Sequence, residues 1–144
     1  MEIGAGSGDG ISATERQTTF CFWAISAAPL YIGADVTALD QADLAILTNQ
    51  EVIAVDQAGV PAKAVSTASN QQVWYAKLPD GGIAVGLFNF DTSSVAVTAK
   101  FSDVGASASM SVRDLVSQTD LGKMSTSFSA TLAGHASRLV KLTP

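Results

Sequence analysis

The sequence has little of several residue types, and each shortage excludes a class of protein. Cys21 is the only cysteine, so an intrachain disulfide, a Cys/His zinc cluster and a CxxC redox motif are excluded. Lysine and arginine number eight against thirteen acidic residues, and the net charge of -5 leaves no basic surface for nucleic acid. The longest apolar stretch, residues 20–34, contains Pro29 and Gly33 and falls short of the roughly 20 residues that span a membrane. We therefore expect neither a nucleic-acid partner nor membrane insertion.

The remaining composition is that of a globular chain. Of its 144 residues, 47% are apolar and only 15% are charged, which predicts one ordinary domain or two small ones with a hydrophobic core. No cationic segment followed by an apolar one opens the chain, so a secretory signal, if the protein is exported, is expected outside it.

The first 58 residues predict helices around one buried strand. Ser12 and Glu15 have the spacing of a capping box, which predicts a helix over residues 13–26, stopped by Pro29. Its expected apolar face consists of Phe20, Trp23, Ala24 and Ala27. Leu30–Ile32, bounded by Pro29 and Gly33, is typical of a fully buried strand.

Two more helical segments are expected before the pattern changes. Asp40 is a predicted N-cap, with Asp43 in the first turn and Leu44 and Leu47 facing inward. Asn49 is expected to end that helix, and residues 51–57 predict another one or two helical turns. Gly59 and Pro61 then break the pattern, so we place a domain boundary between residues 58 and 59.

From Ala62 onward the residues alternate between apolar and polar, which predicts an antiparallel all-β unit. The expected strands cover residues 63–66, 72–78, 83–89, 95–101, 111–114, 127–132 and 137–142. A buried parallel strand needs partners on both sides, and residues 1–58 supply none. Either this segment packs its helices on the β unit in a small α+β fold, or the chain is the C-terminal end of a longer protein.

The order of the segments resembles the C-terminal end of glycoside hydrolase family 27, the α-galactosidase family. The matching stretches of the first part are Met1–Gly4 (end of barrel strand seven), Thr18–Ile25 (the helix after it), Ala28–Asp35 (strand eight and its loop) and Ile46–Gln57 (the last barrel helix and exit). Those of the second part are Val73–Lys77, Ile83–Asn89, Ser111–Leu115, Gly134–Ala136 and Leu139–Leu142, which resemble strands of the family's C-terminal β domain. The resemblance covers nearly the whole chain.

The resemblance implies a (β/α)8 TIM barrel followed by an antiparallel β-sandwich, and retaining hydrolysis of terminal α-linked galactose or a related sugar. In that mechanism one carboxylate attacks the anomeric carbon and a second, about 5 Å away, acts as acid and then base. A whole barrel takes about 250 residues, so residues 1–58 would supply only its last βα units and residues 59–144 the sandwich. The family's two catalytic aspartates lie upstream, so the resemblance implies no catalytic residue, cofactor or metal in this chain.

Partners and compartment are likewise implied by the resemblance. The expected partners are the remainder of the catalytic barrel and, through the parent enzyme, a galactoside or related glycan. Barrel surface left uncovered would favour a homodimer. The residues themselves leave the compartment open, whereas family members are often secreted, which implies an extracellular protein.

Few residues of this chain are candidates for chemistry. Asp35 ends the expected strand, where barrels place functional groups, and is the one substrate-proximal candidate, although capping of the next turn is the favoured interpretation. Asp40 and Asp43 fit a capping pair better than acid/base work. His135, the only histidine, is expected at the start of an edge strand, and Cys21 is expected to be a buried small hydrophobe.

The glycine-rich opening and one strand complete the candidates. Residues 4–10 lack the Lys-Ser/Thr of a P-loop and do not fit GxGxxG, so no nucleotide site is expected. Trp74 and Tyr75 alternate on one strand, so one of them could stack on a sugar, although packing against the barrel is favoured.

The sequence therefore predicts the C-terminal part of an α-galactosidase-like hydrolase that is inactive alone. The alternative is a stand-alone, non-catalytic β-sandwich module that binds carbohydrate or another protein. That alternative would need two or three co-planar exposed aromatic rings, and aromatic residues make up only 7% of the chain.

Overall fold

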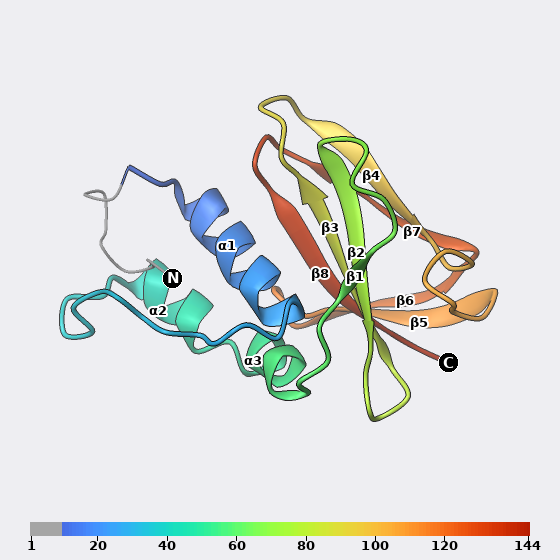
Figure 1. Cartoon of the computed structure of the whole chain (residues 1–144), viewed down its shortest axis with the longest axis horizontal. Helices are drawn as coiled ribbons and strands as arrows, with labels where there is room; N and C mark the ends of the chain where they lie inside the picture. Colours follow the sequence, from blue (N-terminus) through green and yellow to red (C-terminus); the bar gives the residue numbers. More distant parts are fainter. Residues whose placement is uncertain (1–9) are drawn as a thin grey trace.

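The computed structural model describes residues 10–144, which form a layer of helices against a β-sandwich (Figure 1). The helices are α1 (Ala13–Ile25), α2 (Gln41–Leu47) and α3 (Gln50–Gln57). The strands are β1 (Lys63–Ala64), β2 (Gln71–Lys77), β3 (Ile83–Asn89), β4 (Val95–Lys100), β5 (Ser109–Asp114), β6 (Thr119–Ser125), β7 (Ser127–Leu132) and β8 (Ser137–Thr143). All strand pairs are antiparallel.

Local side-chain caps begin all three helices. In the capping box of α1, Glu15 N donates to Ser12 Oγ (3.2 Å) and Ser12 N donates to Glu15 Oε2 (2.8 Å), as predicted. Asp40 caps α2 by accepting from the amide of Asp43 (2.8 Å). Asn49 is the N-cap of α3, where its Oδ1 accepts from two backbone amides. The same side chain donates through Nδ2 to the carbonyl of Leu115 (3.0 Å), so the start of α3 is tied to the end of β5.

The sandwich consists of a six-stranded sheet in the order β1-β2-β3-β8-β5-β6 and a two-stranded sheet of β4 and β7. The space between the two sheets holds the sandwich core, which includes Val85, Leu87, Phe101, Val140 and Leu142. Every residue of β3 is buried, so this central strand is covered on both faces of its sheet.

The other face of the large sheet is covered by the helices. A second apolar cluster, here called the helix–sheet cluster, joins Phe20, Cys21, Ala24, Ile25, Val52 and Val55 to Ala76, Ala84, Phe88, Leu115 and Leu139. Gly86 permits the close approach, because a Cβ at this position would lie 2.5 Å from the Phe88 ring and 3.3 Å from Ile25. The two parts of the chain therefore share a core. The division at residues 58 and 59 stays a prediction, although Gly59 does end the helical part with a φ of +66°.

The predicted strand at Leu30–Ile32 is wrong. This segment forms no strand, and the side chains of Tyr31 and Ile32 are 78% and 41% exposed. A parallel barrel strand is stabilised by neighbours on both sides, and residues 10–144 offer none at this place. The expected inward orientation of Leu44 is also wrong, since this side chain is 41% exposed on α2.

Two further expectations are corrected on the β side and one on α1. β6 is a strand that the sequence did not predict, because its residues are almost all exposed and polar and apolar residues do not alternate along it. His135 does not begin an edge strand, because β8 lies between β3 and β5. On α1 the most buried residues are Phe20, Cys21, Ala24 and Ile25, whereas Trp23 and Ala27 are half-buried. Within the described part of the chain, no helix is long and apolar enough to cross a membrane.

Candidate functional site

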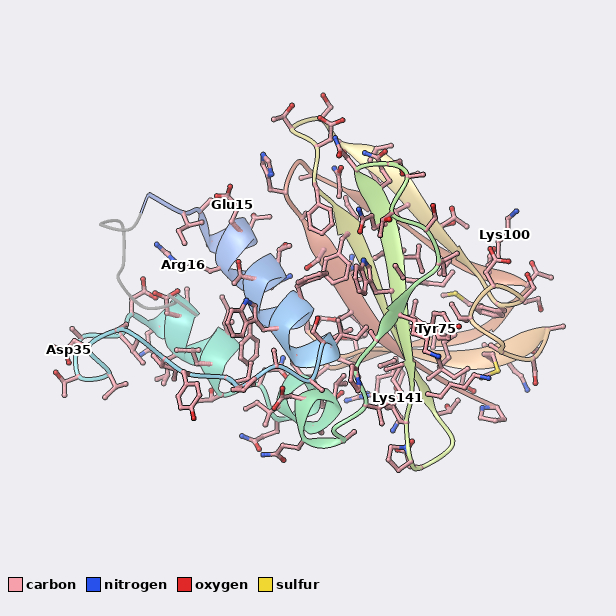
Figure 2. All side chains as sticks on the ribbon, viewed as in Figure 1. Glu15, Arg16, Asp35, Tyr75, Lys100 and Lys141 are labelled. Atoms are coloured by element: carbon pink, nitrogen blue, oxygen red, sulfur yellow. The ribbon has the colours of Figure 1, made fainter. Side chains whose placement is uncertain are left out.

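Asp35 lies on an exposed loop of the helical layer. Its Oδ1 accepts from the hydroxyl and the amide of Thr37 (2.7 and 2.9 Å), and these bonds lower the pKa of the carboxyl. Figure 2 shows this loop at the end of the molecule farthest from the sandwich. These contacts are those of a turn-capping carboxylate, the favoured interpretation, and proximity of Asp35 to a substrate stays a prediction.

The carboxylates of α2 serve structure. Asp40 caps the helix, and Asp43 is 1% exposed beneath it. Asp43 Oδ1 lies 3.7 Å from Nη1 of Arg16 on α1, which is also buried, and this distance makes an ion pair rather than a hydrogen bond. Asp40 thus caps α2, and Asp43 joins α2 to α1 through its ion pair with Arg16. The two carboxylates do not form the acid/base arrangement of a hydrolase.

The two candidate nucleophilic groups are held in structural roles. Cys21 is 1% exposed, and burial raises the pKa of its thiol to about 12, so it is a neutral, buried small hydrophobe as expected. His135 adopts a left-handed φ of +59° in the turn before β8, where its amide donates to the carbonyl of Asp91 (3.0 Å). Its own carbonyl accepts from the hydroxyl of Thr18 (2.8 Å), which ties this turn to α1.

Trp74 and Tyr75 face opposite sides of the large sheet. Trp74 packs against the helix–sheet cluster, with its ring centroid 5.1 Å from that of Phe22 in an edge-to-face arrangement, and its Nε1 donates to Gln72 (3.0 Å). Tyr75 packs against the sandwich core. Trp74, on the face of the sheet that the helices cover, therefore packs against α1, in line with the favoured interpretation that these residues serve packing.

A charged link that the sequence did not predict joins α3 to the sheet. Arg113 on β5 donates to both carboxylate oxygens of Glu51 on α3 (2.8 and 2.6 Å) and to Asp120 on β6 (2.8 Å). These bonds raise the pKa of the guanidinium further above its usual range. Glu51 and Arg113 line a cleft of about 460 Å³. Lys141 and Asp80, which line the same cleft, form a second ion pair. Every charged group lining this cleft is thus already paired.

The described residues contain no group of three or more His, Cys, Asp or Glu side chains that could hold a metal ion. The chemistry-bearing side chains lie in separate parts of the molecule: Asp35 in the helical layer, Cys21 in the helix–sheet cluster and His135 in the turn before β8.

Both parts of the chain match known families. Residues 5–58 match the model described as alpha galactosidase A, and residues 68–142 match that of the alpha galactosidase C-terminal beta sandwich domain. The chain belongs to the α-galactosidase family. The matches follow the family's order along almost the whole chain, and the helices α1 to α3 fall within the first of them.

Similar proteins agree with this assignment. An α-galactosidase of Coffea arabica is 36% identical over 148 residues, which cover 100% of this chain and 38% of that protein. The crystal structure of α-galactosidase I from Mortierella vinacea superposes with a TM-score of 0.91 at 30% identity, covering 99% of this chain and 38% of that one. A family 27 β-L-arabinopyranosidase from Geobacillus stearothermophilus gives a TM-score of 0.88 at 31% identity, covering 93% of this chain and 31% of that one.

This α-galactosidase-family chain thus spans well under half the length of the relatives that it matches. Its fold is the one that the resemblance implied: the last part of the family's (β/α)8 barrel, here seen as helices, followed by the antiparallel β-sandwich.

Proposed function

We propose that this chain works within an α-galactosidase-like retaining glycoside hydrolase, where residues 1–58 complete the catalytic barrel and the sandwich supports it. The observation that carries the proposal is the helix–sheet cluster, which fixes the barrel-derived helices on the outer face of the sandwich. The same helical layer exposes apolar side chains at Tyr31 (78%), Val36 (62%) and Leu44 (41%). A group of exposed apolar residues in one layer is typical of a surface that another structure covers.

We expect the chain alone to be inactive. Three carboxylates of the helical layer, Asp35, Asp40 and Asp43, are engaged in a turn, a helix cap and an ion pair. The test is hydrolysis of a chromogenic α-galactoside and a chromogenic β-L-arabinopyranoside, the two sugars that the relatives' names indicate. No turnover above buffer is expected. Turnover that survives Asp35→Ala would contradict the placement of the catalytic pair upstream of this chain.

The parent protein is identified by the mass of the native gene product. Peptides of this chain are traced, in cells and medium of the source organism, to an intact polypeptide. A species several hundred residues long is expected and would place the catalytic carboxylates upstream. A stable species of 144 residues would instead favour the stand-alone module.

The exposed apolar side chains of the helical layer predict the partner. In the longer parent enzyme these side chains contact the remainder of the barrel. In the isolated chain, a second copy of the chain contacts them instead. We expect a concentration-dependent dimer by light scattering, which Tyr31→Lys weakens. Leu121→Lys is the matched control, because Leu121 is a 37% exposed residue on β6, and it should leave the dimer unchanged. A chain that stays monomeric at high concentration would contradict this expectation.

A further inference from the structure

A cleft of about 330 Å³, here called the aromatic cleft, lies where α1 meets the turns at the ends of β3 and β8. Phe22, Trp23 and Phe90 supply its apolar walls, and Glu15, Thr19 and His135 supply its polar groups. Figure 2 shows Glu15 at the N-terminal end of α1. Phe22 also packs against the helix–sheet cluster, whereas Phe90 and His135 belong to the sandwich part of the chain.

The aromatic walls are fixed by their own packing. The ring of Phe90, which is 38% exposed, stacks on Phe88 with a centroid distance of 5.7 Å and an interplanar angle of 9°. The ring of Phe22 meets Phe90 edge to face, with centroids 6.0 Å apart. Trp23, expected in the core, is instead half-buried at this cleft. The wall is therefore a pre-organised apolar surface that needs little rearrangement to bind a ligand.

The polar groups beside these rings have hydrogen-bonding capacity to spare. Among the residues that the structure describes, neither the Thr19 hydroxyl nor the His135 imidazole has a hydrogen-bond partner. Glu15 uses Oε2 in the capping box, and these bonds from Ser12 lower the pKa of the carboxyl, so it is an ionised acceptor at neutral pH. A hydroxyl, an imidazole and a carboxylate offer both donors and acceptors to a ligand.

We propose that the aromatic cleft is a saccharide-binding site that takes one pyranose ring of a neutral oligosaccharide. A pyranose presents an apolar C–H face to an aromatic ring and a rim of hydroxyls to polar side chains, which is the combination found here. The volume lies at the low end of small-molecule sites, about 300–1,000 Å³, and suits a single ring. Anionic ligands are disfavoured by Glu15 and by the net charge of -5.

The inference rests on the proposed function, because a glycoside hydrolase meets oligosaccharides. A weak site of this kind acts by raising the effective concentration of a polymeric substrate near the enzyme rather than by reacting with it. Its binding is therefore measured without any catalytic readout.

The test is an NMR titration of the 144-residue chain with galactose, raffinose and galactomannan oligosaccharides. Trp23 Nε1–H and the ring of His135, the only histidine, report from the cleft. The indole of Trp74, which donates to Gln72, is an internal control. We expect saturable shifts of the Trp23 and His135 signals with at least one of these sugars, and a stationary Trp74 signal.

Variants separate specific binding from surface contact. Phe90→Ala should weaken binding about threefold to tenfold, from the loss of one aromatic contact. Leu121→Ala, which truncates a side chain of similar exposure on β6, should not change it. Thr19→Val keeps the side-chain shape while removing the hydroxyl, and should also weaken binding, so the test does not depend on Phe90 alone.

Two results would overturn the site: no saturable shift with any of the sugars, or equal shifts in Phe90→Ala and in the unsubstituted chain. In the first case, shifts with choline would reassign the cleft to a cationic ligand. Failure here is distinguishable from failure of the proposed function. A native protein several hundred residues long that binds no sugar in the cleft refutes only the site, and a sugar-binding native protein of 144 residues refutes only the proposed function.

Discussion

Phe22 joins the helical layer to the sandwich, and its removal tests whether the two unfold together. Its ring on α1 meets those of Trp74, Phe88 and Phe90, at centroid distances of 5.1, 5.1 and 6.0 Å. Truncation of a fully buried phenylalanine costs about 3–5 kcal/mol, and about half of this applies to the half-buried Phe22. Each lost ring pair adds up to about 1 kcal/mol. Phe22→Ala should therefore lower the free energy of unfolding by about 3 kcal/mol.

For a chain of 144 residues this loss corresponds to a fall in Tm of about 10 °C. Far-UV circular dichroism and tryptophan fluorescence should follow a single transition in both proteins, because the helices and the sheet share the helix–sheet cluster. Tyr31→Ala is the matched control: this aromatic side chain is 78% exposed, so its loss should change stability by less than about 0.5 kcal/mol. A helical transition that separates from an unchanged sheet transition would refute the reasoning.

Three further predictions concern single side chains. Nδ2 of Asn89, which is 0% exposed, donates to the carbonyls of Ser93 and Ala133 (2.8 and 2.9 Å), so Asn89→Asp should cost about 3 kcal/mol in urea unfolding. A cost below about 1 kcal/mol would contradict this account of the turns. The buried Cys21 thiol, with its pKa raised to about 12, should resist alkylation at neutral pH and react in urea, and rapid labelling of the native chain would show it to be accessible. Because folding lowers the pKa of Glu15, its contribution is present above the unfolded pKa and disappears as pH falls through the lower folded value. The difference in unfolding free energy between Glu15→Gln and the unsubstituted chain should thus vanish in acid. A difference that persists there would exclude the ionised carboxylate as its source.

The helix starts could be predicted because their signals are local. The capping box of Ser12 and Glu15 depends on residues three apart, and it lies where the spacing placed it. Strands with apolar-polar alternation or continuous apolar runs, such as β3 and β4, were predicted within about one residue of their bounds for a similar reason. These elements carry their information in their own residues.

The strand predictions failed where neighbouring strands, rather than the residues of the segment itself, decide whether a strand forms. Leu30–Ile32 has the composition of a buried strand but lacks neighbouring strands, so it forms no strand and leaves Tyr31 and Ile32 exposed. β6 has the opposite character, because its mostly exposed residues form a strand by pairing with β5 alone. No pattern within either segment distinguishes the two cases.

The candidate sites could be predicted only where one residue acts with near neighbours. The turn of Asp35 with Thr37 is local and was expected. The link of Arg113 to Glu51 joins residues 62 apart, and the aromatic cleft combines α1 with Phe90 and His135. Such juxtapositions come from the packing of helices on the sheet, which periodicity does not encode.

The double burial of β3 limits how this protein can recombine with its relatives. Since one face of β3 packs on the sandwich core and the other on the helices, a crossover near residue 59 would combine helices and sheet that did not evolve together. Contacts such as Phe22 with Trp74 draw one partner from each side of that junction. We expect chimeras that exchange the helices and the sandwich together to be more stable than chimeras that exchange the sandwich alone. The part of the chain that must be inherited together is therefore larger than the β domain.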